Sequence, residues 1–422
     1  MRTRRVVFVC HTAAGESLRS AHAIAKLDNL VLLGISQNPV GDQLFADTRS
    51  VSDVHNIEQL IEAVRSIGSV DKIVTAQETL LLPVAEANEA LGLAAMSSET
   101  VKRTLNKSRL KATLQRAGVN TPHDQIVTTA EDARRFASEV GYPIVIKPVG
   151  GSGALTTFPI LNEQQLVHVI QLIQPSPARP LIAETFVSGQ ELCFDTITID
   201  NLPRFYTLCE YTPTILDALQ DPERQWRCVM PRDIDDKYRD FIAQGVTAVR
   251  ALEVGHAMTH MEGFANGGFI DATLRPAGAR IAPMFGFACD VDPYRVWARV
   301  AVDGCFDGPL ERKYTVGTIF LRGPGSGTIE QVTGIDAFRQ KLGQLIVEAH
   351  WPKPGARKSA TYTGDGYVTV RHPDRAVVQH ALNVIDRSIK IAYSNPGPDS
   401  PAWAERLHNY KSLATPAWEG TL

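Results

Sequence analysis

Residues 260–275 read HMEGFANGGFIDATLR, a pattern of two short strands joined by an Asn-Gly pair. Asn-Gly is a strong signal for a tight β-hairpin turn. A turn centred on that pair places Phe264 opposite Phe269 and Glu262 opposite Asp271. Like charges directly opposite each other on a sheet repel and lower its stability. The hairpin therefore raises the question of what lies between the two carboxylates.

The same register gathers polar side chains on one face of the hairpin. Because side chains alternate along a strand, this face carries His260, Glu262, Asp271, Thr273 and Arg275. Hard oxygen ligands favour Mg²⁺, which keeps several waters and bridges to substrate phosphates. The pattern predicts either a metal site at Glu262, Asp271 and Thr273, or a solvent-facing hairpin whose repulsion Arg275 relieves.

Composition sets the frame for this hairpin. The chain has 422 residues, of which 44% are hydrophobic and 21% charged, enough for two or three domains with substantial cores. A formal net charge of −3 disfavours a nucleic-acid partner. No apolar run reaches the length of a signal-peptide core or the roughly 18 residues of a membrane span. The cysteines are scattered without a C-x-x-C pair, which predicts reduced, mostly buried thiols. We expect a cytoplasmic protein without a membrane partner.

The first zone, residues 1–98, alternates apolar runs with amphipathic helical patterns. Such alternation predicts a small parallel sheet with crossover helices, a Rossmann-like α/β domain. The turn after the first apolar run reads HTAAGES and contains a single glycine. A dinucleotide-binding fingerprint needs G-x-G-x-x-G at this place, so we interpret the zone as a scaffold domain.

The second zone, residues 99–305, begins with the segment SSETVKRTLNKSRLKATLQRAGVNTP. This segment predicts one long helix that ends at Gly118 and is followed by Pro122. A further helix is expected at residues 130–139. The zone then turns to short strands, where its candidate functional residues gather.

A glycine-rich loop follows the strand at residues 144–146, in the sequence GYPIVIKPVGGSG. The strand delivers Lys147, and glycines allow backbone N–H groups to approach phosphate oxygens. The loop is not a Walker A motif, because no G-K-[ST] follows it. A flexible surface loop is the alternative interpretation. The candidate phosphate-binding residues are Lys147, Gly150, Gly151, Ser152 and Gly153.

The next segment, LIAETFVSGQELCFDTITID, predicts a strand that carries Glu184, a turn, and a second strand that starts near Glu191. Phe186 and Val187 would offer an apolar shelf for an adenine ring. A carboxylate at Glu191 could accept hydrogen bonds from the two ribose hydroxyls. The alternative is a plain hairpin with solvated acids.

These motifs, in this order and spacing, resemble those of the ATP-grasp superfamily over nearly the whole chain. The matching segments are NKSRLKATLQRAGVNTP, YPIVIKPVGGSG, ETFVSGQE, HME and DATLR. The resemblance implies an ATP-grasp fold with a mobile lid at residues 118–183. It also implies roles for individual residues, with ATP phosphates held by Lys107 and Lys147, adenine by Glu184, Phe186 and Val187, ribose by Glu191, magnesium by Glu262 and Asp271, and the transferred γ-phosphate by Arg275.

Two positions depart from the family pattern. Asp271 stands where the family has glutamate, and Thr273 stands where it has asparagine. Both side chains are shorter, which leaves open whether the site holds one Mg²⁺ or two, with Mn²⁺ as a substitute.

The third zone, residues 306–422, predicts an α+β extension with a helix at residues 373–388 and a loop and tail after residue 393. It resembles the C-terminal extension of L-amino-acid ligases and carnosine synthase. That branch implies an ATP-dependent carboxylate–amine ligase, which forms an amide through an acyl phosphate and releases ADP and phosphate, and it implies a homodimer. The open alternatives are an ATP-grasp carboxylase or thiol ligase, and a non-catalytic nucleotide-binding protein. We expect substrate specificity to involve Arg275, Arg280 and residues 211–232 with Trp226.

Overall fold

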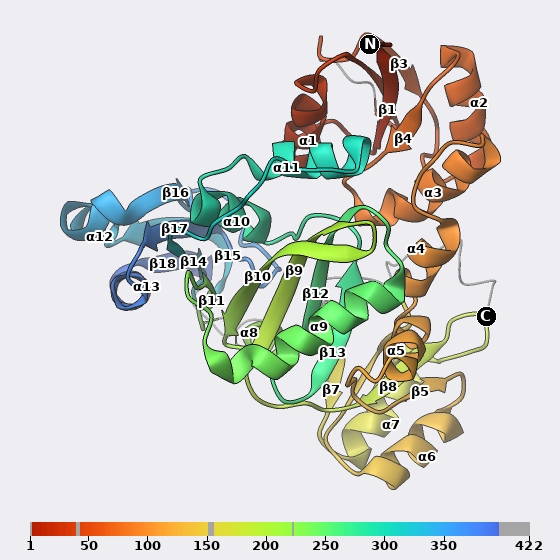
Figure 1. Cartoon of the computed structure of the whole chain (residues 1–422). Helices are drawn as coiled ribbons and strands as arrows, with labels where there is room; N and C mark the ends of the chain where they lie inside the picture. Colours follow the sequence, from red (N-terminus) through yellow and green to blue (C-terminus); the bar gives the residue numbers. More distant parts are fainter. Residues whose placement is uncertain (1, 39–42, 151–155, 222, 396–422) are drawn as a thin grey trace.

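The N-terminal part of the chain forms a parallel sheet with helices on its crossovers. The structure, a computed structural model, describes residues 2–38, 43–150, 156–221 and 223–395 (Figure 1). The strands follow the order β3-β2-β1-β4. Their bounds and those of the helices are β1 (Arg4–Cys10), α1 (Gly15–Ala25), β2 (Leu30–Ser36), β3 (Asp47–Ser50), α2 (Ile57–Ile67), β4 (Lys72–Val74), a 3₁₀ turn (Glu78–Leu80) and α3 (Leu81–Ala90). The apolar ends of β1 and β2 are buried, as expected for a sheet covered on both faces. The predicted parallel sheet is confirmed.

The segment after this sheet contains two helices rather than the single predicted one. Helix α4 (Ser98–Leu105) ends at Asn106, and α5 (Lys107–Arg116) begins directly after it. Asn106 has an extended backbone, and its side-chain oxygen accepts the N–H groups of Ser108 and Arg109. Asparagine is a strong N-cap, so it starts a new helix here. The break places Lys107 at the first position of α5, where its N–H donates to the Val149 carbonyl.

A separate sheet, which we call the lid sheet, follows α5 and lies at the lower right of Figure 1. Its order is β5-β8-β6-β7, and antiparallel pairs connect it throughout. The elements are β5 (Asp124–Val127), α6 (Ala130–Val140), β6 (Ile144–Pro148), β7 (Phe158–Ile160), α7 (Glu163–Ile173) and β8 (Leu181–Thr185). Helix α6 begins with a capping box between Thr129 and Asp132, which explains why its predicted start is right.

The central sheet runs from the hairpin at residues 257–273 into the C-terminal part of the chain. Its order is β13-β12-β9-β10-β11-β14-β17-β16. The strands are β9 (Glu191–Ile199), β10 (Leu202–Thr212), β11 (Trp226–Met230), β12 (Ala257–Phe264), β13 (Gly268–Thr273), β14 (Thr315–Leu321), β16 (Ile346–His350) and β17 (Gly366–His372). This sheet continues across the boundary expected at residue 305. Strands β8 and β9 belong to different sheets, so the plain hairpin considered for residues 181–199 is excluded.

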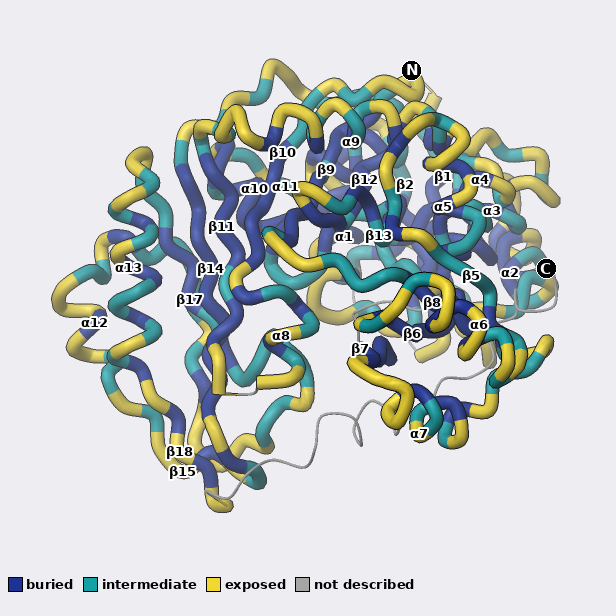
Figure 2. The backbone as a smooth tube through the Cα atoms, turned by 90° about the horizontal axis from the view of Figure 1, so that it is seen from below, coloured by how far each residue is buried: buried dark blue, intermediate teal, exposed yellow. Residues whose placement is uncertain are grey.

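Helices cover this sheet, and its strands form much of the buried interior in Figure 2. Helix α9 packs on β9 and β10, whereas α10 and α13 contact β14. The remaining elements are α8 (Ile215–Gln220), a 3₁₀ turn (Asp236–Tyr238), α9 (Arg239–Leu252), α10 (Ile281–Cys289), α11 (Pro293–Ala298), a π-helical turn (Arg299–Asp303), β15 (Ser326–Thr333), α12 (Ile335–Leu342), a 3₁₀ turn (Gly343–Leu345), α13 (Arg375–Ser388) and β18 (Lys390–Asn395). Among the described residues, no helix is long and apolar enough to cross a membrane.

The hairpin of β12 and β13 has the predicted register at its functional positions. Glu262 pairs with Asp271, as the alternation predicts. Near the turn the prediction is wrong, because Phe264 pairs with Gly268 instead of Phe269. The turn is one residue longer than expected, and a β-bulge at Ile270 restores the register.

The tip of this hairpin touches the segment that enters the lid sheet. A Cβ at Gly268, whose φ is +77°, would lie 1.9 Å from the Asn120 carbonyl oxygen. The Phe269 N–H donates to that same oxygen at 2.9 Å. Only glycine fits both the backbone conformation and the close approach. The hairpin therefore anchors the entrance to the lid.

Candidate functional site

Two adjacent cavities meet at the hairpin carboxylates. The first, which we call the lid cavity, has a volume of about 290 Å³ and lies between the lid sheet and the central sheet. The second, the hairpin cavity, has a volume of about 250 Å³ and reaches toward the N-terminal domain. Both are lined by Ile215, Glu262 and Asp271. The hairpin therefore forms a shared wall between two compartments.

Lysines surround one buried carboxylate of the lid cavity. The Glu184 carboxylate lies 2.9 Å from the Lys147 Nζ and 2.8 Å from the Lys111 Nζ. Burial opposes its ionisation, but the two cations hold the pKa of Glu184 below its usual value. Burial lowers the pKa of Lys111. Lys147 extends from β6 and Glu184 from β8, so the antiparallel pairing of these strands brings them together.

Lys111 is a further buried lysine that was not among the predicted site residues, although its spacing from Lys107 could have marked it. Lys111 follows Lys107 by four residues on α5, which puts both on one helix face. Lys107 forms an ion pair with Asp271, with 2.9 Å between Nζ and Oδ2. Burial opposes its charge, but Asp271 raises the pKa of Lys107. Both lysines are therefore buried in ion pairs, and Lys107 also lines the lid cavity.

Most of the predicted nucleotide-binding residues line the lid cavity. They are Lys107, Lys147, Gly150, Glu184, Phe186, Val187 and Glu191. Three further predictions, Gly151, Ser152 and Gly153, lie outside the described residues. The apolar shelf is present, because Phe186 and Val187 share the cavity wall with Ile270.

Glu191 is a buried acid at the N-terminus of α8. One of its oxygens accepts the Ile215 N–H at 2.7 Å. Burial, with a further contribution from Glu262, raises the pKa of Glu191 to about 8. Glu191 is 4% exposed and lines the lid cavity.

The hairpin offers a set of oxygen atoms that suits a divalent cation. Glu262 and Asp271 face each other on paired strands. Thr273 is 5% exposed, and its Oγ1 has no hydrogen-bond partner among the described residues. Two carboxylates with a buried, unsatisfied hydroxyl nearby are hard oxygen donors of the kind that Mg²⁺ takes. The residues present therefore fit the predicted metal, although Asp271 already pairs with Lys107.

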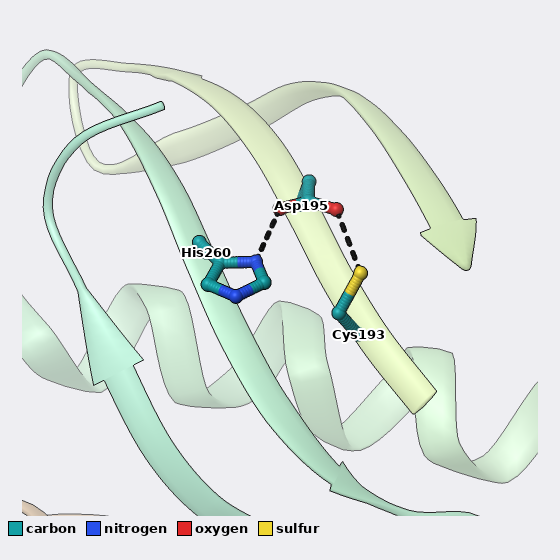
Figure 3. A group of neighbouring side chains, drawn as sticks. All are labelled: Cys193, Asp195 and His260. Carbon is teal, nitrogen blue, oxygen red and sulfur yellow. Dashed lines mark hydrogen bonds and ion pairs between the residues drawn. The ribbon is translucent and has the colours of Figure 1, made fainter. Parts of the chain in front are cut away.

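The side chains of Cys193, Asp195 and His260 lie together on the neighbouring strands β9 and β12 (Figure 3). His260 Nδ1 lies 2.7 Å from Asp195, and His260 Nε2 lies 3.3 Å from Glu262 Oε1. The Tyr211 hydroxyl donates to the same Glu262 oxygen at 3.3 Å. Burial opposes the charge of the imidazole, but Asp195 raises the pKa of His260 well above its usual value. His260 was predicted on this face without a role, and Asp195 and Tyr211 were not among the predicted site residues.

Arg275 lines the hairpin cavity with the other residues predicted for that face, His260, Glu262, Asp271 and Thr273. Its Nε and Nη2 donate to Glu78 Oε2 at 3.1 and 2.5 Å. Glu78 comes from the N-terminal domain, 197 positions earlier in the chain. No local pattern in the sequence marks this partner. The predicted scaffold domain thus contributes a charged residue to the site.

Two residues expected to affect specificity lie elsewhere. Trp226 is fully buried and packs against Tyr211 and Tyr362. It supports the wall of the hairpin cavity from behind, since both tyrosines line that cavity. Arg280 lines a different hollow and pairs with Glu348.

The chain is similar in sequence to known ATP-binding proteins and ligases. Residues 106–180 match the family model of the carbamoyl-phosphate synthase L chain, ATP binding domain. An L-arginine-specific L-amino acid ligase from Bacillus subtilis is 25% identical over 313 residues, which cover 71% of this chain and 74% of that protein.

Solved structures show the same fold. The crystal structure of an L-amino acid ligase from Bacillus licheniformis matches with a TM-score of 0.73 at 18% identity, over 94% of this chain and 100% of that one. The biotin carboxylase domain of 2-oxoglutarate carboxylase from Hydrogenobacter thermophilus, solved with MgADP and bicarbonate, matches with a TM-score of 0.65 at 16% identity, over 93% and 91% of the two chains.

The chain has the ATP-grasp fold. In sequence and fold the chain is similar to ATP-dependent amino acid ligases, and these similarities support an ATP-dependent ligase of the carboxylate–amine type. The predicted fold class is confirmed.

Proposed function

We propose that this enzyme joins the carboxylate of one amino acid to the amine of another, with ATP converted to ADP and phosphate. The observation that carries the proposal is the shared wall of the two cavities. Glu262 and Asp271 face the lid cavity on one side and the hairpin cavity on the other. ATP in the lid cavity and a carboxylate substrate in the hairpin cavity would meet at this wall, where phosphoryl transfer needs them.

The nucleotide would take the lid cavity. Phe186 and Val187 would contact adenine, Glu191 would accept ribose hydroxyls, and Lys107 and Lys147 would hold phosphate oxygens. The ion pairs of these lysines with Asp271 and Glu184 fix the two cations in place before ATP arrives. Cations placed in advance at the phosphate site need no reorganisation during transfer. The Gly150 backbone at the end of β6 would lie beside the phosphates.

The transfer itself would occur at the hairpin. A substrate carboxylate oxygen attacks the γ-phosphorus and ADP leaves, while the Arg275 guanidinium stabilises the transferred group. A magnesium ion held by Glu262 and Asp271, with Thr273 nearby, would neutralise charge on the phosphate oxygens. The amine of the second substrate then attacks the acyl carbon of the acyl phosphate, and phosphate leaves. We propose that residues 118–183 close over the cavity and keep water from the acyl phosphate.

The hairpin cavity suits a zwitterionic substrate. Arg275 presents positive charge there, and Glu78 accepts from it with Oε2 alone. Among the described residues, Glu78 Oε1 has no hydrogen-bond donor, so it is available to an ammonium group. Tyr211 and Tyr362 complete the wall with apolar ring surface. An α-amino acid carries the matching carboxylate and ammonium.

Products test this proposal. Purified protein, ATP and pools of amino acids should release phosphate and ADP, and mass spectrometry should detect a dipeptide. AMP with pyrophosphate would contradict the acyl-phosphate route. Bicarbonate dependence would indicate a carboxylase, and coenzyme A dependence a thiol ligase. ATP binding without turnover under every pool would indicate a non-catalytic protein. A domain layout of residues 1–98, 99–305 and 306–422, and a homodimer, stay predictions.

A further inference from the structure

Asp195, His260 and Glu262 form a chain of contacts that the proposed reaction does not use directly. Strands β9 and β12 pair antiparallel, with His260 opposite Asp195 and Glu262 opposite Cys193. Both oxygens of Asp195 are engaged, since Oδ1 contacts His260 Nδ1 at 2.7 Å and Oδ2 accepts the Cys193 thiol at 3.1 Å. Figure 3 shows Cys193, Asp195 and His260 turned toward one another. The imidazole ring is thereby fixed in orientation.

The opposite edge of the imidazole ring contacts Glu262, on the wall that the two cavities share. His260 Nε2 and the Tyr211 hydroxyl both contact Glu262 Oε1, each at 3.3 Å. Among the described residues, Glu262 Oε2 has no hydrogen-bond partner. One carboxylate oxygen is thus held by two groups, and Glu262 lines both cavities.

A metal ion within the group of Cys193, Asp195 and His260 is a different interpretation of these residues, since their ligand atoms lie within 4.8 Å of one another. The contacts of 2.7 and 3.1 Å between these atoms are hydrogen-bond lengths. A zinc ion at about 2.0–2.3 Å from each ligand would force them further apart. The hydrogen-bonded arrangement therefore favours a role through Glu262.

We propose that the Asp195–His260 pair positions the Glu262 carboxylate for the metal of the ATP site. This inference rests on the proposed function of the hairpin. A free carboxylate rotates about its last bond, and ordering it upon metal binding has an entropic cost. Holding Oε1 in advance removes part of that cost and aims Oε2 at the cation. Hydrogen-bond partners of metal ligands typically change metal affinity or activity by about 10–100-fold when they are mutated.

A binding experiment separates this role from catalysis. The measured quantity is the ratio of ADP Kd values in EDTA and in saturating Mg²⁺, by isothermal titration calorimetry. His260→Asn keeps an amide donor near the Nδ1 position, where it can reach Asp195, but loses the contact to Glu262. His260→Gln keeps a donor near the Nε2 position, where it can reach Glu262. His256→Asn is the matched control, because His256 lies near Asp200 at the surface.

We expect Mg²⁺ to tighten ADP binding to the wild-type protein and to His256→Asn equally. His260→Asn should lose about tenfold or more of that gain, and His260→Gln should lose less. If His260→Asn does not fold, Tyr211→Phe, which removes the second contact to Oε1, should lose part of the gain.

Three results would overturn the proposal: an unchanged ratio in the folded variants, an equal loss in His260→Asn and His260→Gln, or no Mg²⁺ effect on ADP binding in the wild-type protein. All of these results come from ADP binding and do not require catalytic turnover. Absence of dipeptide formation would contradict the proposed function. The effect of His260 on Mg²⁺-dependent ADP binding would still be tested separately.

Discussion

The protonation of Glu191 makes nucleotide binding depend on pH. Burial and the neighbouring Glu262 raise the pKa of Glu191 to about 8, so near pH 7 the acid is mostly protonated in the nucleotide-free protein. Only the ionised carboxylate accepts strong, charge-assisted hydrogen bonds from both ribose hydroxyls. Nucleotide binding should therefore lower this pKa and release a proton.

The size of the effect follows from the pKa. With a value of about 8, about a tenth of the protein carries ionised Glu191 near pH 7. Ionising the remainder costs about 1.4 kcal/mol, which equals a tenfold change in Kd. Because binding selects the ionised form, affinity should rise as the pH increases toward about 8 and then become constant.

Calorimetry of ADP binding in EDTA measures this directly. Titrations between pH 7 and pH 9 give the Kd, and two buffers with different ionisation enthalpies give the number of protons released. Glu191→Gln is the matched control, since it retains an acceptor and has no titrating group there. Titration of ADP itself affects both proteins equally.

If the Kd of ADP has the same pH dependence in the wild-type protein and in Glu191→Gln, the predicted ionisation of Glu191 on binding is wrong. The prediction is also wrong if the wild-type protein releases no proton to buffer near pH 7. Either outcome would mean that ribose does not contact the ionised acid, and it would remove Glu191 from the nucleotide site.

Three further substitutions test the lid cavity and the hairpin cavity. Lys147→Ala should abolish ADP formation and weaken ATP binding, which a filter-binding assay with labelled ATP would show; near-normal turnover would remove Lys147 from the site. Lys111→Met leaves buried Glu184 with one cation, so we expect a loss of about 3 kcal/mol in unfolding free energy by urea titration; the double variant with Glu184→Gln should regain part of it, and an additive loss would contradict the coupling. Arg275→Lys keeps the charge but not the fork-shaped pairing with Glu78; kcat should fall strongly with little change in the Kd of ADP, and an equal effect on both would place Arg275 in the nucleotide site instead.

Local sequence pattern was enough to place Glu262 opposite Asp271. Alternation along β12 and β13 put Glu262 opposite Asp271, because side-chain direction in a strand depends on position alone. The bulge at Ile270 was not predicted. It offsets the extra turn residue, so the strand register from Glu262 and Asp271 onward is the same as without both. The split of α4 from α5 was readable from Asn106, a strong N-cap within a helical pattern.

The partners of the predicted residues required the tertiary structure. Glu78 forms an ion pair with Arg275, 197 positions away in the sequence. Glu184 of β8 forms an ion pair with Lys111 of α5. The pair of Asp195 and His260 depends on the register between β9 and β12, which are 65 positions apart at that point. A sequence specifies backbone periodicity over a few residues, and that was sufficient to find the hairpin, Lys147 at the end of its strand and Glu191 at the start of the next. Which charges meet is decided by how separate elements pack, because the free energy of an ion pair depends on distance and burial, and neither is written in the local pattern.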